Sequence, residues 1–242
     1  MLLAPHLALK FALGPLLLAQ GAYARSVLPR LPEAEGPRQG QSGRGELALN
    51  LLIVGDSSAA GVGVERQDDA LSGRLPRALA AHLGRRIGWQ LCARTGITTA
   101  QAASLLDEVR PADVAVVITG VNDVLDQVPP GRAIGARQAL LATLRERAGV
   151  RHVVWTPVPP MDKFEGLPQP LRWVLGQDAA AHEQALRDWA RLEAGISHLP
   201  FELPVDDTTL LASDGFHPSA GLYATWADAL ATHIAEAVWP RL

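Results

Sequence analysis

A serine, an aspartate and a histidine in this chain have the types and spacing of a nucleophilic catalytic triad. A serine hydroxyl becomes an effective nucleophile when an imidazole takes its proton, and the imidazole needs an acceptor on its other ring nitrogen. Asp214 precedes His217 by three residues, with a glycine between them to allow a tight turn, so the two side chains can pair locally. Ser57 follows a continuous apolar run, at a position typical of a turn from a strand into a helix. These residues predict that His217 pairs with Asp214 and activates Ser57 for attack on a carbonyl carbon.

Three N–H donors in the chain are candidates to stabilise the oxyanion that such an attack produces. They are the backbone N–H groups of Ser57 and Gly96 and the side-chain amide of Asn122. Glycine at position 96 lets the backbone approach a substrate closely, and the helix expected after Ser57 has an N-terminus that favours developing negative charge. We therefore expect these three groups to form an oxyanion hole.

Two acidic residues beside these candidates have simpler interpretations. Asp56 precedes the serine, where a carboxylate can accept backbone N–H groups of the turn, and Asp123 is suited to bracing the loop of Asn122. Taken one at a time, Ser57 would be interpreted as a helix N-cap and Gly96 as an ordinary turn residue. The functional interpretation therefore depends on the whole set.

Short apolar runs alternate with helical patterns through most of the chain. The expected strands span 47–54, 87–92, 114–118 and 151–156, and the expected helices span 71–83, 98–109, 130–147, 177–192 and 220–238. Such alternation implies βαβ units and a parallel sheet that is covered by helices on both faces. In sheets of this kind ligands bind beyond the carboxyl ends of the strands. The polar clusters that follow the strands are therefore expected to gather in one cleft.

These clusters also occur in the order of the motif blocks of the SGNH, or GDSL-type, serine hydrolase family, which this chain resembles. The residues that carry the resemblance are Gly55-Asp56-Ser57, Gly96, Gly120-x-Asn122-Asp123 and Asp214-x-x-His217. The resemblance implies an α/β fold, a three-layer α/β/α flavodoxin-like sandwich with a central parallel sheet of strand order 2-1-3-4-5. It implies esterase, lipase, thioesterase or deacetylase activity without a metal ion. It also implies that Ser57 is the nucleophile, although the family usually has leucine where this chain has a second hydroxyl, Ser58.

The segment from Val158 to Gly176 is the most distinctive stretch outside these motifs. It combines prolines with large apolar residues directly after the fourth expected strand. Binding pockets are mostly apolar, so Phe164, Leu167 and Trp173 are candidates to line the site that holds an acyl group. The alternative is a long loop that only covers the end of the sheet.

Composition and charge argue against several other classes of protein. Hydrophobic residues make up 48% of the 242 residues and charged residues 19%, which favours a folded core over disorder. The formal net charge of -3 gives no strong field that would attract nucleic acid. The chain has no Gly-x-Gly-x-x-Gly run, no P-loop and no histidine pair at i and i+4, so neither a nucleotide cofactor nor zinc is expected. Cys92 is the single cysteine, which excludes an internal disulfide.

The first 19 residues are strongly apolar and leave three interpretations open. A transmembrane span would be short and interrupted by Pro5, Lys10 and Pro15. An export signal fits the small residues of Ala22-Tyr23-Ala24 but lacks a basic start. A membrane-associated or docking helix fits the apolar content, with a kink expected at Pro15. The protein is accordingly expected to be membrane-associated or cytoplasmic, with export to the periplasm or outside the cell as the alternative.

A change of composition divides the chain after this segment. Residues 29–46 are rich in Pro, Gly, Arg and Glu, which is typical of a linker that lies over the surface. The folded unit is expected to begin abruptly at Leu47, where the first strand pattern starts. We therefore expect an apolar N-terminal segment at 1–28, a linker at 29–46 and a hydrolase domain at 47–242.

The function that these observations favour is hydrolysis of carboxylic esters through an acyl-enzyme on Ser57. The apolar segments favour lipid-like acyl esters or lysophospholipids as substrates. The alternative within the same fold is O-deacetylation of a carbohydrate or cell-envelope glycan. A hypothesis of another class, a flavodoxin-like binding module without catalysis, is disfavoured by the intact triad and by Asn122.

Overall fold

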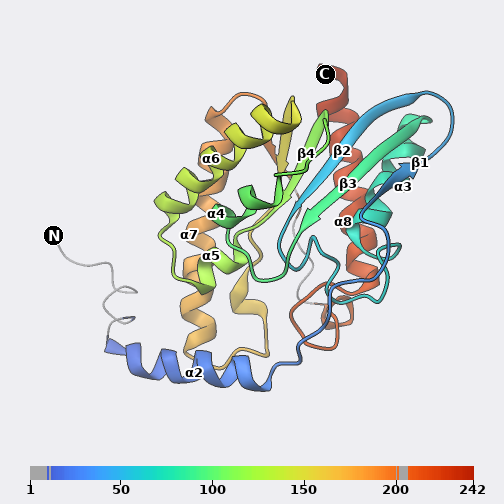
Figure 1. Cartoon of the computed structure of the whole chain (residues 1–242). Coiled ribbons are helices and arrows are strands. Elements are labelled where there is room, and N and C mark those ends of the chain that lie inside the picture. The colour runs from blue at the N-terminus through green and yellow to red at the C-terminus, as the bar shows by residue number, and fades with distance from the viewer. Residues whose placement is uncertain (1–9, 11, 200, 202–206) are drawn as a thin grey trace.

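A six-stranded, mostly parallel sheet forms the centre of the computed structural model (Figure 1). The structure describes residue 10, residues 12–199, residue 201 and residues 207–242. The strands are β1 (Gln39–Ser42), β2 (Leu47–Gly55), β3 (Arg86–Ala93), β4 (Val114–Ile118), β5 (His152–Trp155) and β6 (Ile196–His198). They lie in the order β1-β3-β2-β4-β5-β6, and every neighbouring pair is parallel except β1 and β3.

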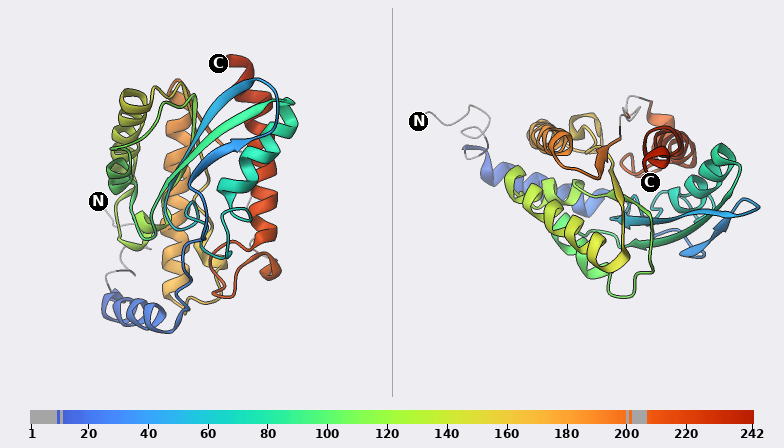
Figure 2. Two further views of the ribbon diagram at one scale, coloured as in Figure 1. Left: turned by 45° about the vertical axis from the view of Figure 1, so that its right-hand side comes forward. Right: turned by 90° about the horizontal axis from the view of Figure 1, so that it is seen from above.

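Helices cover both faces of this sheet and produce three layers (Figure 2). The described α-helices are α2 (Gly14–Val27), α3 (Leu71–Leu83), α4 (Thr99–Ala102), α5 (Val121–Leu125), α6 (Pro130–Ala148), α7 (Leu171–Leu192) and α8 (Ala220–His233). Apolar side chains of α3 and α8 pack on one face, and those of α6 and α7 pack on the other with the short α4 and α5. The expected α/β/α sandwich is therefore confirmed.

The central strands are apolar along their whole length because helices bury both of their faces. Side chains alternate along β2, so Leu51 and Ile53 pack with α3 and α8, whereas Leu52 and Val54 pack with α6 and α7. All four side chains are fully buried. This double burial explains the unbroken apolar run in the sequence.

The order of the parallel strands agrees with the sequence-based expectation, but the sheet has one strand more at its edge. Counted without β1, the order β3-β2-β4-β5-β6 is the 2-1-3-4-5 order that the resemblance implied. Strand β1 lies within residues 29–46, where only a surface linker was expected. Its side chains are polar and largely exposed, so no apolar pattern marks it as a strand. The segment nevertheless pairs with β3 and buries the Ala34 side chain, so part of it belongs to the sheet.

The helix expected over 98–109 is shorter in the structure. Beyond α4 it continues only as a 3₁₀ turn over Ala103–Leu105. The Ser104 hydroxyl donates a hydrogen bond to the Gln101 carbonyl over 2.8 Å, and side-chain bonds of this kind compete with regular helix bonds. The expected beginning is confirmed, since Thr98 is the N-cap of α4.

Helix α7 begins at Leu171 rather than at the expected Gln177. Pro170 precedes its first turn, where the missing N–H of a proline costs no helical hydrogen bond. Leu171 and Val174 bury their side chains and so stabilise this early start. Residues that the sequence suggested as part of a loop, Trp173 among them, therefore lie on a helix.

Helix α2 crosses one end of the domain, below the sheet in the view of Figure 1. Pro15 occupies its first turn, where the backbone N–H groups have no partner inside the helix to lose. The kink expected at Pro15 stays a prediction, because the chain before α2 is only partly described. Residues 1–9 and 11 of the apolar segment lie outside the described residues. In the described part, no helix is long and apolar enough to cross a membrane.

Close packing between the loop after Ser57 and the chain that follows His217 depends on Gly63. This residue has a φ of +106°, and a Cβ added to it would lie 2.2 Å from the Pro218 carbonyl oxygen. We predict that Gly63→Ala lowers the free energy of unfolding by about 2–5 kcal/mol, because left-handed strain adds to overpacking. Urea denaturation measures this loss.

Gly45→Ala is the matched control for this prediction. Gly45 also has a positive φ, +79°, but no atom lies within 4 Å of an added Cβ. Its substitution should lower the free energy of unfolding by only about 1–2 kcal/mol. Equal losses for the two variants would show that contact with Pro218 is not what restricts position 63.

Candidate active site

Ser57, His217 and Asp214 form a continuous chain of hydrogen bonds. The Ser57 Oγ lies 2.9 Å from His217 Nε2, and His217 Nδ1 lies 2.6 Å from Asp214 Oδ2. An ionised carboxylate only accepts, so Nδ1 carries the proton and Nε2 is left to accept the serine hydroxyl. Ser57 lies directly after β2, and the other two residues lie in the loop before α8. The sheet thus brings two distant parts of the chain into the geometry of a serine–histidine–aspartate triad. The helix expected directly after Ser57 is absent, because a series of turns leads from Ser57 to α3.

The Asp214 carboxylate organises the loop that presents His217. Its Oδ1 accepts the backbone N–H groups of Phe216 and His217, each at 3.0 Å, while Oδ2 faces the imidazole. Burial by itself would raise the Asp214 pKa, but the hydrogen bonds from His217 and Phe216 and the charge of His217 lower this pKa below its ordinary value. Asp214 is therefore ionised at neutral pH and aligns the imidazole with both of its oxygens.

Asn122, in the first turn of α5, connects this helix to the loop that carries Gly96. Its Nδ2 donates to the Ile97 carbonyl over 2.9 Å, and its second contact, with Asp56 Oδ2, is long and weak at 3.5 Å. One amide hydrogen therefore remains available to a ligand. Gly96 has a φ of +82° and no atom within 4 Å of an added Cβ, so its backbone is open. Gly96 follows β3 and Asn122 follows β4, so these two predicted donors lie at the same end of the sheet as Ser57.

Two buried carboxylates lie beneath these groups. Asp123 accepts hydrogen bonds from the backbone N–H of Thr99 at 3.1 Å and from its hydroxyl at 2.5 Å, which ties α5 to the start of α4. Asp56 accepts the backbone N–H of Ser58 at 3.1 Å. Burial raises the Asp56 pKa to about 7, while the Ser58 N–H and the charge of His217 oppose this shift and Asp123 adds to it. Within the described ranges, no group of three or more His, Cys, Asp or Glu side chains is arranged to hold a metal ion.

A buried arginine that the sequence did not reveal lies behind the loop that begins α5. Arg137 of α6 is fully buried, and its guanidinium carbon lies 6.0 Å from the centroid of the Trp155 ring. Its guanidinium nitrogens have no hydrogen-bond partner among the residues that the structure describes. Burial lowers the Arg137 pKa, and the negative charges of Asp123 and Glu183 oppose that shift. An arginine in a helix normally reaches solvent, so its type gave no signal of this position.

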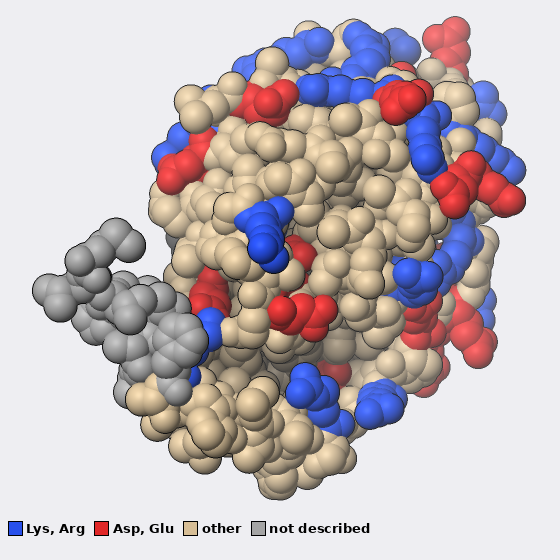
Figure 3. Space-filling view, turned by 60° about the vertical axis from the view of Figure 1, so that its left-hand side comes forward, with Lys and Arg blue, Asp and Glu red and all other residues tan. Residues whose placement is uncertain are grey.

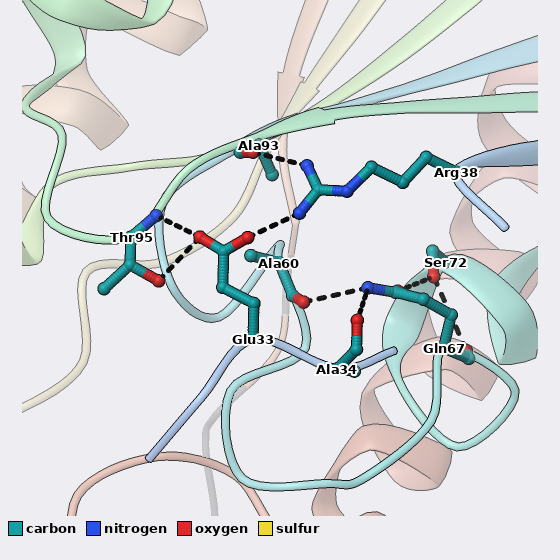
Figure 4. A network of polar contacts seen from close by, with 8 residues as sticks. All are labelled: Glu33, Ala34, Arg38, Ala60, Gln67, Ser72, Ala93 and Thr95. Carbon is teal, nitrogen blue, oxygen red and sulfur yellow. Dashed lines mark hydrogen bonds and ion pairs between the residues drawn. The ribbon is translucent and has the colours of Figure 1, made fainter. Parts of the chain in front are cut away.

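Glu33, in the expected linker, clamps the loop next to Gly96 (Figure 4). Its Oε1 accepts the backbone N–H of Thr95 at 2.7 Å and the Thr95 hydroxyl at 2.9 Å. Its other oxygen pairs with Arg38, which also donates to the Ala93 carbonyl over 2.6 Å. Burial by itself would raise the Glu33 pKa, but the bonds from Thr95 and the charge of Arg38 lower it below its ordinary value. This glutamate is therefore an ionised acceptor that holds the end of β3.

Gln67 fastens the same segment to the loop that follows the serine (Figure 4). Its side-chain amide donates to the carbonyl oxygens of Ala34 at 3.0 Å and Ala60 at 2.9 Å. The hydroxyl of Ser72 donates to the Gln67 amide oxygen, and all of these bonds are buried. Residues 29–46 are thus attached to two of the loops that form the candidate site.

Two of the three residues predicted to line a substrate site border cavities near the triad. Phe164 lines a small cavity of about 50 Å³, to which Phe216 also contributes. Leu167 lines a larger one of about 510 Å³, which extends to Asn122. Trp173 is 37% exposed on α7 and lines neither cavity. The structure therefore separates Trp173 from the other two residues.

Comparison with known proteins adds a sequence relationship to this geometry. The model of the GDSL-like Lipase/Acylhydrolase family matches residues 53–225, which include the triad, Gly96 and Asn122. A GDSL-like esterase of Mycobacterium tuberculosis is 30% identical over 254 residues, which cover 94% of this chain and 78% of the relative. Both matches include the loops that supply the candidate catalytic groups.

Solved structures share the arrangement of strands and helices. The lipase Lip_vut3 from a goat rumen metagenome aligns with a TM-score of 0.60 at 19% identity, covering 78% of this chain and 97% of that one. An acetylxylan esterase from Geobacillus stearothermophilus aligns with a TM-score of 0.53 at 15% identity, covering 77% of this chain and 94% of that one. At these identities the likeness establishes the fold.

The raised pKa of Asp56 makes a pH-dependent contribution to stability. In the unfolded chain the Asp56 carboxyl group releases its proton near pH 3.8, whereas in the folded protein it holds the proton until about pH 7. The folded state therefore binds more protons between these values, and it loses stability as the pH rises through this window. We predict that the free energy of unfolding of the wild type falls relative to that of Asp56→Asn between about pH 4 and pH 7, then stays level.

Urea denaturation of both proteins across this pH range measures the difference. Asp68→Asn, at an exposed position, controls for the loss of one negative charge. A difference between wild type and Asp56→Asn that is constant with pH would contradict a raised pKa at Asp56.

Proposed function

Because the chain belongs to the GDSL-like lipase/acylhydrolase family and is a carboxylic ester hydrolase, we propose that it cleaves lipid-like acyl esters through an acyl-enzyme on Ser57. The observation that carries this proposal is the hydrogen-bonded chain from Ser57 through His217 to Asp214. The lowered pKa of Asp214 supports it, because an ionised carboxylate stabilises the imidazolium that forms during the reaction.

The proposed reaction begins when His217 Nε2 takes the hydroxyl proton as Ser57 Oγ bonds to the ester carbonyl carbon. The electron pair of the carbonyl bond moves to its oxygen, where the N–H groups of Ser57 and Gly96 and the amide of Asn122 stabilise it. When the carbonyl reforms, the bond to the alcohol oxygen breaks and the alcohol leaves with the proton held by His217. Water, deprotonated in turn by His217, then attacks the acyl-enzyme carbonyl; the bond to Ser57 Oγ breaks, Oγ recovers the proton from His217, and the acid is released.

The surroundings of the imidazole support an apolar acyl group. The Phe216 ring lies edge-on to the His217 ring at 5.1 Å and contacts the Phe164 ring at 4.6 Å between centroids. Both phenylalanines line the small cavity, and Phe216 also lines the large one. Apolar surface of this kind favours binding of hydrocarbon over binding of a sugar.

O-deacetylation of a carbohydrate is the second candidate. The small cavity of about 50 Å³ has room for no more than a short acyl group, and the acetylxylan esterase from Geobacillus stearothermophilus has the same fold. The larger cavity of about 510 Å³ favours longer acyl groups, since its size is typical of a ligand pocket. Hydrolysis rates for esters of increasing chain length decide between the two candidates.

Covalent labelling and ester hydrolysis test the role of Ser57. A fluorophosphonate should label the wild type and Ser58→Ala but not Ser57→Ala, and only Ser57→Ala should lose about 10³-fold or more in hydrolysis of p-nitrophenyl butyrate.

Asn122→Ala should fold normally and lose about 10²–10³ in kcat, because one oxyanion donor is removed. Labelling of Ser57→Ala, or near-normal activity of Asn122→Ala, would contradict the proposed roles.

The Glu33 clamp should affect the reaction although Glu33 is not expected to touch the substrate. Glu33→Ala removes the acceptor for Thr95, so the N–H of Gly96 loses its fixed position and kcat should fall about tenfold with little change in KM. Glu33→Gln keeps one acceptor oxygen and should retain most of the rate. The control is Glu35→Ala, at an exposed position in the same segment. Equal activity of the Glu33 and Glu35 alanine variants would exclude a positioning role for the clamp.

A further inference from the structure

A hollow of about 510 Å³ lies between helix α2 and the body of the domain. Figure 3 shows it as a recess above a mostly uncharged surface at the bottom of the view. Most of its lining is aliphatic, with Leu17 and Ala24 from α2 and with Leu171 and Val174 from α7. Its size lies in the range of pockets that hold small organic ligands. The hollow is therefore large and apolar enough to bind a hydrocarbon chain.

The hollow reaches the groups that we assign to the reaction. Asn122 and Phe216 both line it. The Phe216 ring is in edge contact with the His217 imidazole, and Asn122 is the expected side-chain donor to the oxyanion. A chain attached to a carbonyl carbon at Ser57 could thus enter the hollow directly.

Polar contacts, rather than close packing along its length, hold α2 in place. The Gln20 amide donates to the Gln169 carbonyl over 2.7 Å and accepts the Leu171 N–H at 3.1 Å, at the start of α7. Lys10 forms an ion pair of 2.6 Å with Asp178, further along α7. Only two residues of α2 are buried. These contacts leave a space between the two helices.

The face of α2 that lines this space carries two glycines. Gly14, Leu17, Gly21, Ala24 and Leu28 follow one another at intervals of three or four residues and all border the hollow. A Cβ on Gly14 would meet no atom within 4 Å, and a Cβ on Gly21 would meet only the end of Arg25 at 3.6 Å. Glycine weakens a helix by about 1 kcal/mol relative to alanine, so nothing in α2 itself favours these residues. Their effect is to keep the hollow open.

The direction of α2 gives the hollow a near end and a far end. A Cβ on Gly166 would lie 3.0 Å from Leu28 and 3.8 Å from the Asp214 carbonyl, so the last turn of α2 is next to the triad loop. Gly21 and Gly14 lie successively further away, about 10 Å apart along the helix axis. Helix α2 also lies outside residues 53–225, to which the family model matches.

We propose that this hollow binds the acyl chain of the substrate ester, and that Gly21 and Gly14 of α2 determine how long a chain it admits. The proposal rests on the proposed function, since it places the carbonyl at Ser57 and the chain along α2. The occupant is a saturated or unsaturated fatty acyl chain, because the lining is mostly aliphatic and continuous with Phe216.

Chain-length profiles of α2 variants of the full chain test this proposal. The substrates are p-nitrophenyl esters from acetate to palmitate, kept below the concentrations at which they form micelles. For the wild type, kcat/KM should rise about three- to fourfold per added methylene until the hollow is filled. Gly21→Leu should keep kcat/KM for the acetate ester within about twofold of the wild-type value. It should lower kcat/KM for the octanoate and longer esters at least about tenfold, because a leucine side chain blocks the middle of the hollow. Gly14→Leu should lower kcat/KM only for the longest esters.

The matched control is Ala22→Leu, which adds a leucine to the exposed side of the same helix and should leave the profile unchanged. A Gly21→Leu profile equal to that of the wild type would overturn the proposal. So would an equal loss on every ester, acetate included, since that result would mean that α2 only supports the fold. The proposal would also be overturned if the wild type hydrolysed the acetate ester but none of the esters with longer chains. Ser57 would then remain the nucleophile of a short-chain esterase.

A binding measurement separates failure of this proposal from failure of the proposed function. Palmitate should displace a fluorescent fatty acid from Ser57→Ala, and Gly21→Leu in that background should weaken palmitate binding at least about tenfold. If the wild type hydrolyses no ester while this binding persists, the ester hydrolase mechanism at Ser57 is wrong and the acyl site stands. If neither hydrolysis of long esters nor palmitate binding is observed, the acyl site is wrong.

Discussion

The hydrogen bonds of the Asp214 carboxylate are the constraint on which the rest of the site depends. One oxygen holds the turn through two backbone N–H groups, and the other holds the imidazole of His217. Because the same side chain shapes the loop and orients the ring, the Nε2 atom can face Ser57 only while the turn is intact. The sheet then has to supply a serine at the right place, which it does at the end of β2.

Three charged side chains are buried close to the candidate site, and they have few hydrogen-bond partners. Asp56 and Asp123 lie next to each other in a region that also contains the fully buried guanidinium of Arg137. Water is excluded there, so each charge acts on the others more strongly than it would at the surface. Burial of the carboxylate is the main reason why the Asp56 pKa rises to about 7, and the negative charge of Asp123 adds to the rise. This places a titrating group next to Ser57 in the chain and near the His217 imidazole.

The chain before β2 contributes to the site from outside the range that the family model matches. Glu33 holds Thr95, Gln67 binds Ala34 to the loop after Ser57, and α2 forms one wall of the large cavity. A part of the chain with the composition of a linker thus supports the loops around the triad. The part that the family model matches carries the candidate catalytic groups, and we infer that the N-terminal part adapts their surroundings to a particular acyl chain.

The sequence by itself determined the features that depend on neighbouring residues or on a repeated burial pattern. The pairing of Asp214 with His217 spans three residues, and double burial of the central strands leaves continuous apolar runs that mark the order of the elements. The tertiary structure alone decided the features that join distant residues of ambiguous type. Glu33 and Thr95 are 62 positions apart, and a glutamate in a polar segment is equally compatible with solvent. Side-chain type does not reveal which surfaces of a folded chain meet. The tertiary structure therefore also decided the pairing of β1, the burial of Arg137, the position of Trp173 outside both cavities and the space between α2 and α7.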